Sequence, residues 1–350
     1  MNIEKRRYSG IELFRLISIL GIIGSHIYGD LTEKTGLSWF NSNTYIVFSG
    51  IFCFSVTGFI LISGYFGLHA SYKKLFRLNL IISLYGILNY FILLPNSDFS
   101  WKGFLLACVP ILTRKNWFFT CYFALVLISP YLNMLIEHLS KKEMQRMLIM
   151  LVLIFCVFPI YPEFGITLDG GKGIVQMVIT YMIGRYLKLY GMSCKAENKF
   201  CQAGIMLVLI IGANFVLTFL AGHGIRWMSS DNSILTILYA VFVFQGFQTM
   251  KWQNQIVNKF ASCSMAILML ERAIRPVFVQ QMDIYQHWNS KLLFVIIIGT
   301  SICIMIICSI IEIVRKLILT GAENVIVNIT AKIWKKICGC IKEIDIFRHI

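Results

Sequence analysis

The chain has 350 residues, of which 57% are hydrophobic and only 14% charged, and it carries a formal net charge of +15. Its mean hydropathy is +0.73. Soluble domains are about 45–50% apolar and about 25% charged, so this composition excludes a soluble globular protein. The positive charge needs no nucleic-acid partner, because basic loops on the inner side of a membrane face anionic lipid. We predict an all-α polytopic membrane protein.

A membrane-spanning helix needs about 20 mostly apolar residues. The candidate spans, in chain order, cover residues 11–29, 44–66, 78–95, 118–136, 147–160, 173–190, 201–220, 234–250, 261–280 and 292–314. With a cytoplasmic N-terminus, most of the 32 Lys and Arg residues fall on the cytoplasmic side, as the positive-inside rule requires. We therefore predict a bundle of about ten transmembrane helices in the cell (plasma) membrane, with both termini cytoplasmic.

Two regions follow from this pattern. Residues 1–318 form one membrane domain, because no loop is long enough to hold a soluble domain. Residues 319–350 form a basic tail in which isoleucines and lysines alternate at helical spacing. This pattern predicts an amphipathic cytoplasmic helix that lies on the inner leaflet and contacts membrane lipid, with a solvated, disordered tail as the alternative.

The first span contains two strongly polar residues in the segment RLISILGIIGSH, residues 15–26. Arg15 and His26 are eleven residues apart, about three helical turns, so both project from one face roughly 16 Å apart along the axis. Glu12 precedes Arg15 by three residues and is expected to pair with it. Taken alone, Arg15 could be a snorkelling cation and His26 a packed histidine. Their common face favours a functional pair.

The whole segment SGIELFRLISILGIIGSHIYGD, residues 9–30, resembles the opening signature of the membrane-bound acyltransferase 3 family. The resemblance extends in order through FILISGYF (59–66), KKLFR (73–77), NWFFTCYFALVLISPYLN (116–133) and YMIGRYL (181–187). It implies an integral membrane O-acyltransferase, such as an O-acetyltransferase. Its donor would be cytoplasmic acetyl-CoA or another acyl-CoA, and its acceptor a hydroxyl of a cell-surface polysaccharide or lipid-linked sugar.

The residues are compatible with that chemistry. An imidazole accepts a proton near neutral pH, so His26 is the candidate general base, although transient acylation of His26 is an alternative. Arg15 would orient the acyl donor or the histidine. The cations Lys73, Lys74 and Arg77 are candidate contacts for coenzyme A phosphates, or ordinary positive-inside residues. No metal is expected.

Further candidates for substrate binding come from three segments. Ser63 and Tyr65 flank a glycine that permits close backbone approach, although this stretch would equally suit helix packing. Trp117 and Tyr122 are either substrate-stacking or interfacial aromatic residues. In the ninth span the family often has a histidine, but this chain reads SMAILMLERAIRP, residues 264–276. There Glu271 and Arg275 can pair at i and i+4, and would anchor substrate or lock the bundle.

Two other functions fit ten helices with a polar face. A secondary transporter or flippase would also place polar residues within the membrane. A non-catalytic membrane scaffold would not depend on His26 at all. The concentration of intramembrane polar residues in the first and ninth spans favours a single reaction chamber.

Overall fold

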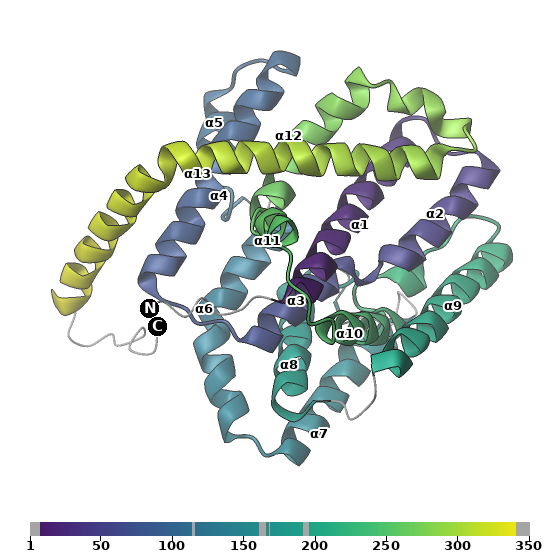
Figure 1. Cartoon of the computed structure of the whole chain (residues 1–350), viewed down its shortest axis with the longest axis horizontal. Coiled ribbons are helices and arrows are strands. Elements are labelled where there is room, and N and C mark those ends of the chain that lie inside the picture. Colours follow the sequence, from purple (N-terminus) through teal and green to yellow (C-terminus); the bar gives the residue numbers. More distant parts are fainter. Residues whose placement is uncertain (1–7, 114–115, 161–165, 168, 192–195, 341–350) are drawn as a thin grey trace.

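The computed structural model describes residues 8–113, 116–160, 166–167, 169–191 and 196–340, which form helices and no strands. The helices are α1 (Ser9–Lys34), α2 (Trp39–Phe52), α3 (Phe54–Phe66), α4 (Tyr72–Leu93), α5 (Trp101–Cys108), α6 (Trp117–His138), α7 (Lys141–Val152), α8 (Ile174–Tyr190), α9 (Ala196–Ala221), α10 (Ile234–Gln248), α11 (Gln255–Ala261), α12 (Ser264–Gln281) and α13 (Leu293–Cys340). Short helical turns are η1 (Leu94–Asn96), η2 (Leu153–Val157), η3 (Phe158–Ile160), η5 (Trp227–Ser229) and η6 (Ile284–Asn289). The predicted all-α class is confirmed (Figure 1).

Within the described residues, 6 helical segments are long and apolar enough to cross a membrane. They are Ser9–Lys34, Trp39–Phe66, Tyr72–Leu93, Trp117–His138, Asn198–Ala221 and Leu293–Lys336. The second joins α2 to α3 through Cys53, whose backbone dihedrals are themselves helical. These segments coincide with six of the ten predicted spans.

The other four predicted spans correspond to shorter or more polar helices. The α8 and α10 helices have 17 and 15 residues, fewer than the about 20 residues of a typical membrane-spanning helix. The α7 helix ends in the π-helical turn η2. The α12 helix carries Glu271, Arg272 and Arg275, which lower its hydropathy. The total of ten therefore stays a prediction.

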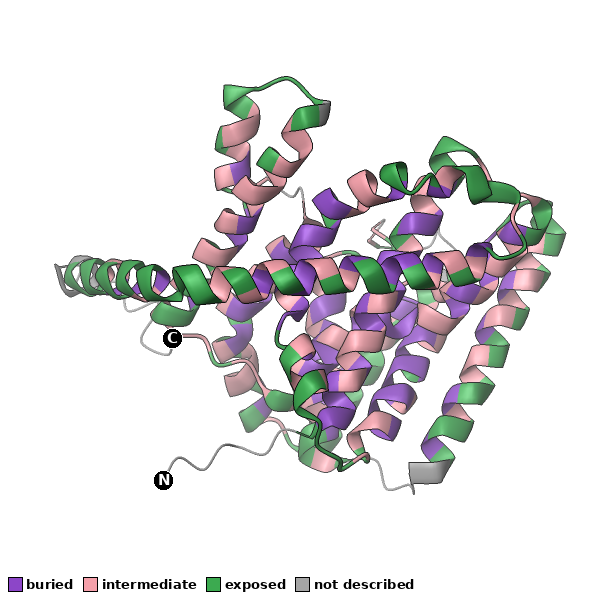
Figure 2. Ribbon diagram, turned by 45° about the horizontal axis from the view of Figure 1, so that its top comes forward, coloured by how far each residue is buried: buried purple, intermediate pink, exposed green. Residues whose placement is uncertain are grey.

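Helix α1 lies at the centre of the bundle, where α2, α3, α10, α11, α12 and α13 contact it (Figure 1). One side of α1 contributes Ile19, Ile23 and Ile27 to a cluster shared with α12 and α13. The other side contributes Phe14, whose ring stacks on Phe54 at 5.3 Å. Figure 2 shows the buried residues gathered in these central helices, whereas α9 and α13 have largely exposed outer faces. Side chains on α1 are therefore held from several directions.

The family-like segments around Gly64 and Gly184 pack α3 against α8. A Cβ atom at Gly64 would lie 2.2 Å from the Tyr181 carbonyl oxygen, and one at Gly184 would lie 2.6 Å from that of Leu61. The Tyr181 hydroxyl also donates a hydrogen bond of 2.7 Å to the Asn133 side chain on α6. Gly64 therefore allows close packing of α3 against α8, which is the helix-packing alternative that the sequence analysis left open.

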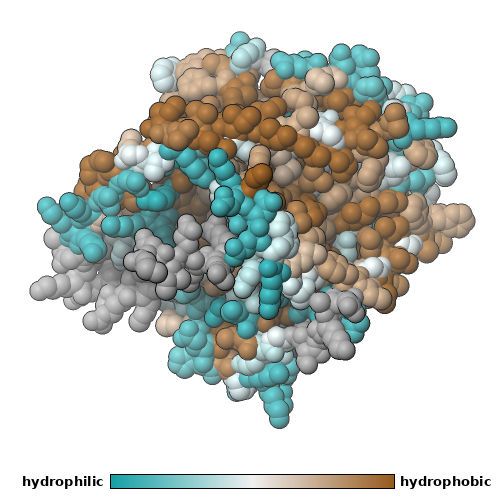
Figure 3. Space-filling view, in the orientation of Figure 1, coloured by the Kyte–Doolittle hydropathy of each residue, from teal (hydrophilic) through white to brown (hydrophobic). Residues whose placement is uncertain are grey.

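Helix α13 runs along one face of the bundle and continues through residue 318 without a break. Figure 3 shows a broad apolar surface over its straight part, and Figure 1 shows its C-terminal part turning away. In that part Asn324 accepts a hydrogen bond of 2.7 Å from Arg77, and Val327 and Ala331 are buried. Its outer residues Ile326 and Ile333 are exposed. The location of this segment on the inner leaflet stays a prediction.

Substituting Gly64 with Ala should destabilise the bundle, because the added methyl group forces α3 and α8 apart. Overpacking of this kind costs about 1–3 kcal/mol, so we expect a melting temperature several degrees lower in detergent. Gly212→Ala on α9 is the matched control, because a Cβ there meets nothing within 4 Å. Equal melting temperatures for the two variants would contradict the close helix contact.

Candidate functional site

His26 is anchored by a buried carboxylate from a distant helix. Its Nδ1 atom lies 3.0 Å from Oε1 of Glu271 on α12. The Glu271 side chain is 5% exposed, whereas the His26 side chain is 47% exposed. A carboxylate at Nδ1 favours the tautomer in which Nδ1 carries the proton and donates it to Glu271. The other ring nitrogen, Nε2, is then left with a lone pair for chemistry.

Glu271 is itself held by Arg275, one helical turn later. Arg275 donates from Nε to the second Glu271 oxygen at 3.0 Å, which confirms the predicted i, i+4 pair. Its Nη1 atom pairs with Asp30 and lies 3.4 Å from the His26 carbonyl oxygen. Asp30 follows His26 by four residues on α1, so the two side chains lie on the same face of that helix. These four residues form a network that ties α1 to α12.

In the part of the chain that the structure describes, three adjoining cavities lie along α1. The first, which we call the loop cavity, has a volume of about 750 Å³ and is walled by most residues of 169–172 and 223–231 together with His26, Tyr45 and Ser55. The second, the histidine cavity, has about 240 Å³ and is lined by His26, Glu271 and Arg275. The third, the arginine cavity, has about 320 Å³ and is lined by Arg15, Ser63 and Tyr122.

The cavities share walls. His26 and Trp117 line both the loop cavity and the histidine cavity. Phe118, Phe119 and Leu268 line both the histidine cavity and the arginine cavity. His26 therefore stands where the first two cavities meet, and Arg15 lines the third, on the side of the histidine cavity away from the loops. The face of α1 that Arg15 and His26 were predicted to share therefore borders the cavities.

Arg15 pairs with Glu12 as expected, with Nη1 2.7 Å from Oε2. In the same cavity the hydroxyl oxygens of Ser63 and Tyr122 lie 3.5 Å apart. Five of the predicted substrate-binding residues each line at least one of the three cavities: Ser63, Tyr122, Trp117, Glu271 and Arg275. The structure therefore brings most of the predicted site residues around α1.

Tyr65 lies elsewhere. Its hydroxyl accepts a hydrogen bond from Gln248, and its ring packs on Phe244 at 5.3 Å within an apolar cluster. It lines none of the three cavities.

The predicted phosphate-binding cations Lys73, Lys74 and Arg77 also lie outside the cavities, on the first turns of α4. Lys74 donates to the His69 carbonyl oxygen at 3.1 Å, and Arg77 is engaged with Asn324. Both bonds are exposed.

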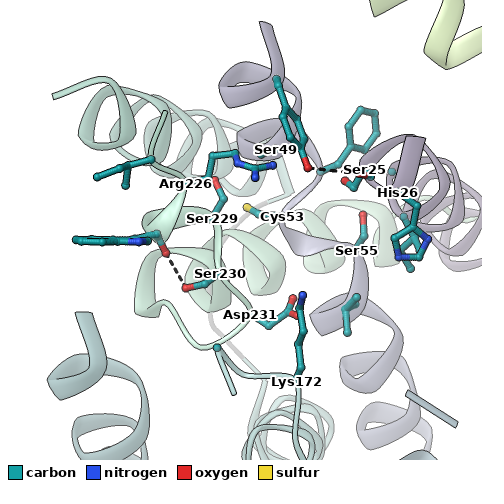
Figure 4. Close-up of a pocket in the computed structure, with 18 of the residues that line it drawn as sticks. Ser25, His26, Ser49, Cys53, Ser55, Lys172, Arg226, Ser229, Ser230 and Asp231 are labelled. Atoms are coloured by element: carbon teal, nitrogen blue, oxygen red, sulfur yellow. Dashed lines mark hydrogen bonds between the residues drawn. The ribbon is translucent and has the colours of Figure 1, made fainter. Parts of the chain in front are cut away.

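Sequence reasoning missed the wall of the loop cavity. Arg226 stacks on the Tyr45 ring, with its guanidinium carbon 3.7 Å from the ring centroid. Gln176 on α8 donates to the Asp231 carbonyl oxygen at 2.9 Å and so holds the loop before α10. Figure 4 shows Arg226, Ser229 and Asp231 facing the cavity opposite the His26 side. Short polar loops between apolar spans carry no motif, so no signal marked these residues.

The electrostatics of this wall centre on Asp231. Burial raises the pKa of its carboxyl to about 7, an effect that Lys172 opposes and Asp169 reinforces. The carboxyl therefore changes charge near neutral pH inside a polar cavity.

A family model described as an acyltransferase domain matches residues 8–311, which include all of the cavity-lining residues named above. No curated protein and no solved structure matches the chain.

Substituting Asp231 with Asn should stabilise the protein at high pH. In the unfolded chain the carboxyl ionises near pH 4, so the stability that its proton supplies is complete below that pH. This stability is lost as the pH rises through about 7. Asn cannot ionise, so the gain of Asp231→Asn over wild type should grow between about pH 4 and 7 and then level off. The difference between a carboxyl pKa near 4 in the unfolded chain and about 7 in the folded protein corresponds to roughly 4 kcal/mol. Because Asp231 is partly exposed, this value is an upper limit for the gain in stability.

Thermal unfolding across this pH range measures the gain. Asp98→Asn, at an exposed carboxylate in the loop after α4, is the matched control and should show no such trend. A gain that is independent of pH would contradict the raised pKa of Asp231.

Proposed function

The chain belongs to the acyltransferase family whose model its residues 8–311 match, and we propose that it transfers an acetyl or similarly short acyl group from cytoplasmic acyl-CoA to hydroxyls of a cell-surface polysaccharide or its lipid-linked precursor. The observation that carries this proposal is the geometry of His26. The ring is fixed by Glu271 through Nδ1 and lies between two adjoining cavities, which would allow a donor and an acceptor to meet at Nε2.

The chemistry requires one proton transfer. A neutral hydroxyl is a poor nucleophile, so Nε2 of His26 would accept its proton as the oxygen attacks the thioester carbonyl carbon. A carbon–oxygen bond forms, the carbon–sulfur bond breaks, and the departing thiolate takes the proton back from the imidazolium. Glu271 would stabilise the imidazolium while it exists. The low exposure of the Glu271 carboxylate reduces the screening of that interaction by water.

The two substrates would approach from opposite sides. The loop cavity is the largest of the three and has hydroxyl, imidazole and charged groups on its wall, which suits a sugar acceptor. The arginine cavity is lined largely by apolar side chains and by Arg15, which suits the arm of an acyl-CoA. The arm would reach His26 through the histidine cavity, which shares a wall with the arginine cavity. With the N-terminus cytoplasmic, the Arg15 end of α1 faces the cytoplasm, where the donor is found.

The phosphate groups of coenzyme A lie at the far end of a long, flexible arm. We propose that they reach beyond the arginine cavity to Lys73, Lys74 and Arg77 on the first turns of α4. Arg77 and Lys74 have exposed hydrogen bonds that a phosphate could replace. Membrane lipid would surround the apolar faces of α9 and α13.

Substituting His26 with Ala should abolish acyl transfer, because the general base is removed, and Arg15→Ala should abolish it through loss of donor orientation. Transfer of radiolabelled acetyl from acetyl-CoA to the host's surface glycan is measured in membranes that contain equal amounts of each variant. His138→Ala, at the exposed end of α6, is the control and should retain wild-type transfer. Transfer that persists in His26→Ala would refute the mechanism, and a wild-type chain without transfer would favour the transporter or scaffold hypothesis.

Substituting Glu271 with Gln should lower kcat while leaving the KM for acetyl-CoA nearly unchanged. The amide keeps the shape of the side chain but removes the negative charge that stabilises the imidazolium, so we expect a loss of about 10²- to 10⁴-fold. Glu143→Gln, at the exposed capping box of α7, is the matched control. A rise in KM with unchanged kcat would assign Glu271 to substrate binding instead.

A further inference from the structure

Ser55, in the first turn of α3, has a buried hydroxyl without a hydrogen-bond partner in the described part of the chain. The residue is 3% exposed, and its Oγ atom makes no bond. Other serines in the bundle donate to a carbonyl of their own helix, as Ser18 does to Phe14 and Ser63 to Phe59. For Ser55 the corresponding carbonyl, that of Ile51, already accepts a hydrogen bond of 3.1 Å from Tyr239. A buried polar group left in this way costs free energy.

The unpartnered hydroxyl lies at the wall of the loop cavity, close to α1. Ser55 is among the residues that line this cavity together with His26. A Cβ atom added to Gly21 of α1 would lie 2.6 Å from the Ser55 Oγ atom, so the absence of a side chain at Gly21 makes room for the hydroxyl. Figure 4 shows Ser55 on the His26 side of the cavity, across from Arg226 and Ser229.

Two other serine hydroxyls on the cavity wall are already engaged. Ser230 donates to the Trp227 carbonyl oxygen at 2.6 Å, and the Ser229 oxygen accepts from Asn214 at 2.9 Å. Ser55 thus offers a buried hydroxyl without a protein partner, whose hydrogen bonds a ligand in the cavity would satisfy.

We propose that Ser55 binds the acceptor sugar through its hydroxyl and so determines acceptor affinity. This inference rests on the proposed function. Ser55 lines the loop cavity but neither the histidine cavity nor the arginine cavity, so it would contact the acceptor and not the acyl donor. A hydroxyl both donates and accepts, which matches the hydroxyl and ring oxygens of a sugar. Ser55 is a binding residue in this proposal, and His26 remains the base.

The test compares Ser55→Ala with Thr57→Val. Thr57 is the matched control, because its hydroxyl is also buried and unpartnered but it lines none of the three cavities. The acceptor probe is surface glycan purified from the organism that makes this chain and stripped of its esters by mild alkali. Radiolabelled acetyl-CoA is the donor.

For Ser55→Ala we expect a roughly tenfold higher KM for the glycan, because the loss of one good hydrogen bond weakens binding by about that factor. The KM for acetyl-CoA should be unchanged. The melting temperature without glycan should be unchanged or higher, because an unsatisfied buried hydroxyl has been removed. The increase in melting temperature that the glycan produces in the wild type should shrink. Thr57→Val should retain the wild-type KM for both substrates.

An unchanged glycan KM in Ser55→Ala would overturn the inference while leaving the proposed function intact. An equal rise in Thr57→Val, or a lower melting temperature in Ser55→Ala, would also overturn it by showing that α3 packing is responsible. A wild-type chain that transfers no acetyl to the glycan would refute the proposed function, and this inference with it.

Discussion

Glu271 is a carboxylate buried in an apolar helix bundle, and the arrangement of α1 and α12 depends on how that charge is compensated. An unpaired charge in such surroundings costs several kcal/mol. Here one carboxylate oxygen faces His26 and the other faces Arg275, which also pairs with Asp30. These pairs form only in one register of α1 and α12, with the two helices correctly aligned along each other. The network that compensates the buried charge of Glu271 therefore also positions the imidazole of His26.

The same register depends on small residues along α1. A Cβ at Gly24 would lie 2.3 Å from the Phe48 ring, and a Cβ at Gly21 would meet Phe52 and Ser55 at 2.6 Å. Helices α2 and α3 therefore pack closely against one part of α1. Gly21, Phe52 and Ser55 also line the loop cavity, so this close packing forms part of the cavity wall next to His26.

Features set by a single helix were predictable from the sequence, whereas features set by the meeting of two helices were not. The pairs Glu12–Arg15 and Glu271–Arg275 follow from the helical period, and both are confirmed. The bond between His26 and Glu271 joins residues 245 apart, so it depends on how the whole bundle folds. Sequence reasoning treated Glu271 as a residue that stands where relatives have a histidine, and its link to His26 emerged only from the fold. Ser63 and Tyr65 were both predicted to bind substrate because they flank the same glycine. In the fold, the Ser63 hydroxyl faces Tyr122, whereas the Tyr65 hydroxyl faces Gln248.

The division between helices and loops has a consequence for how the proposed reaction could change in evolution. His26, Glu271 and Arg275 lie on two packed helices, where a substitution disturbs both the network and the core. Arg226 and Asp231 lie on loops, which tolerate substitution and insertion far better. Under the proposed function, the loops would adapt the cavity to a new acceptor while the transfer chemistry stays unchanged. Ser55 stands between these two classes, because it is fixed on a helix yet faces the acceptor side, so it would bind a feature that different sugar acceptors share.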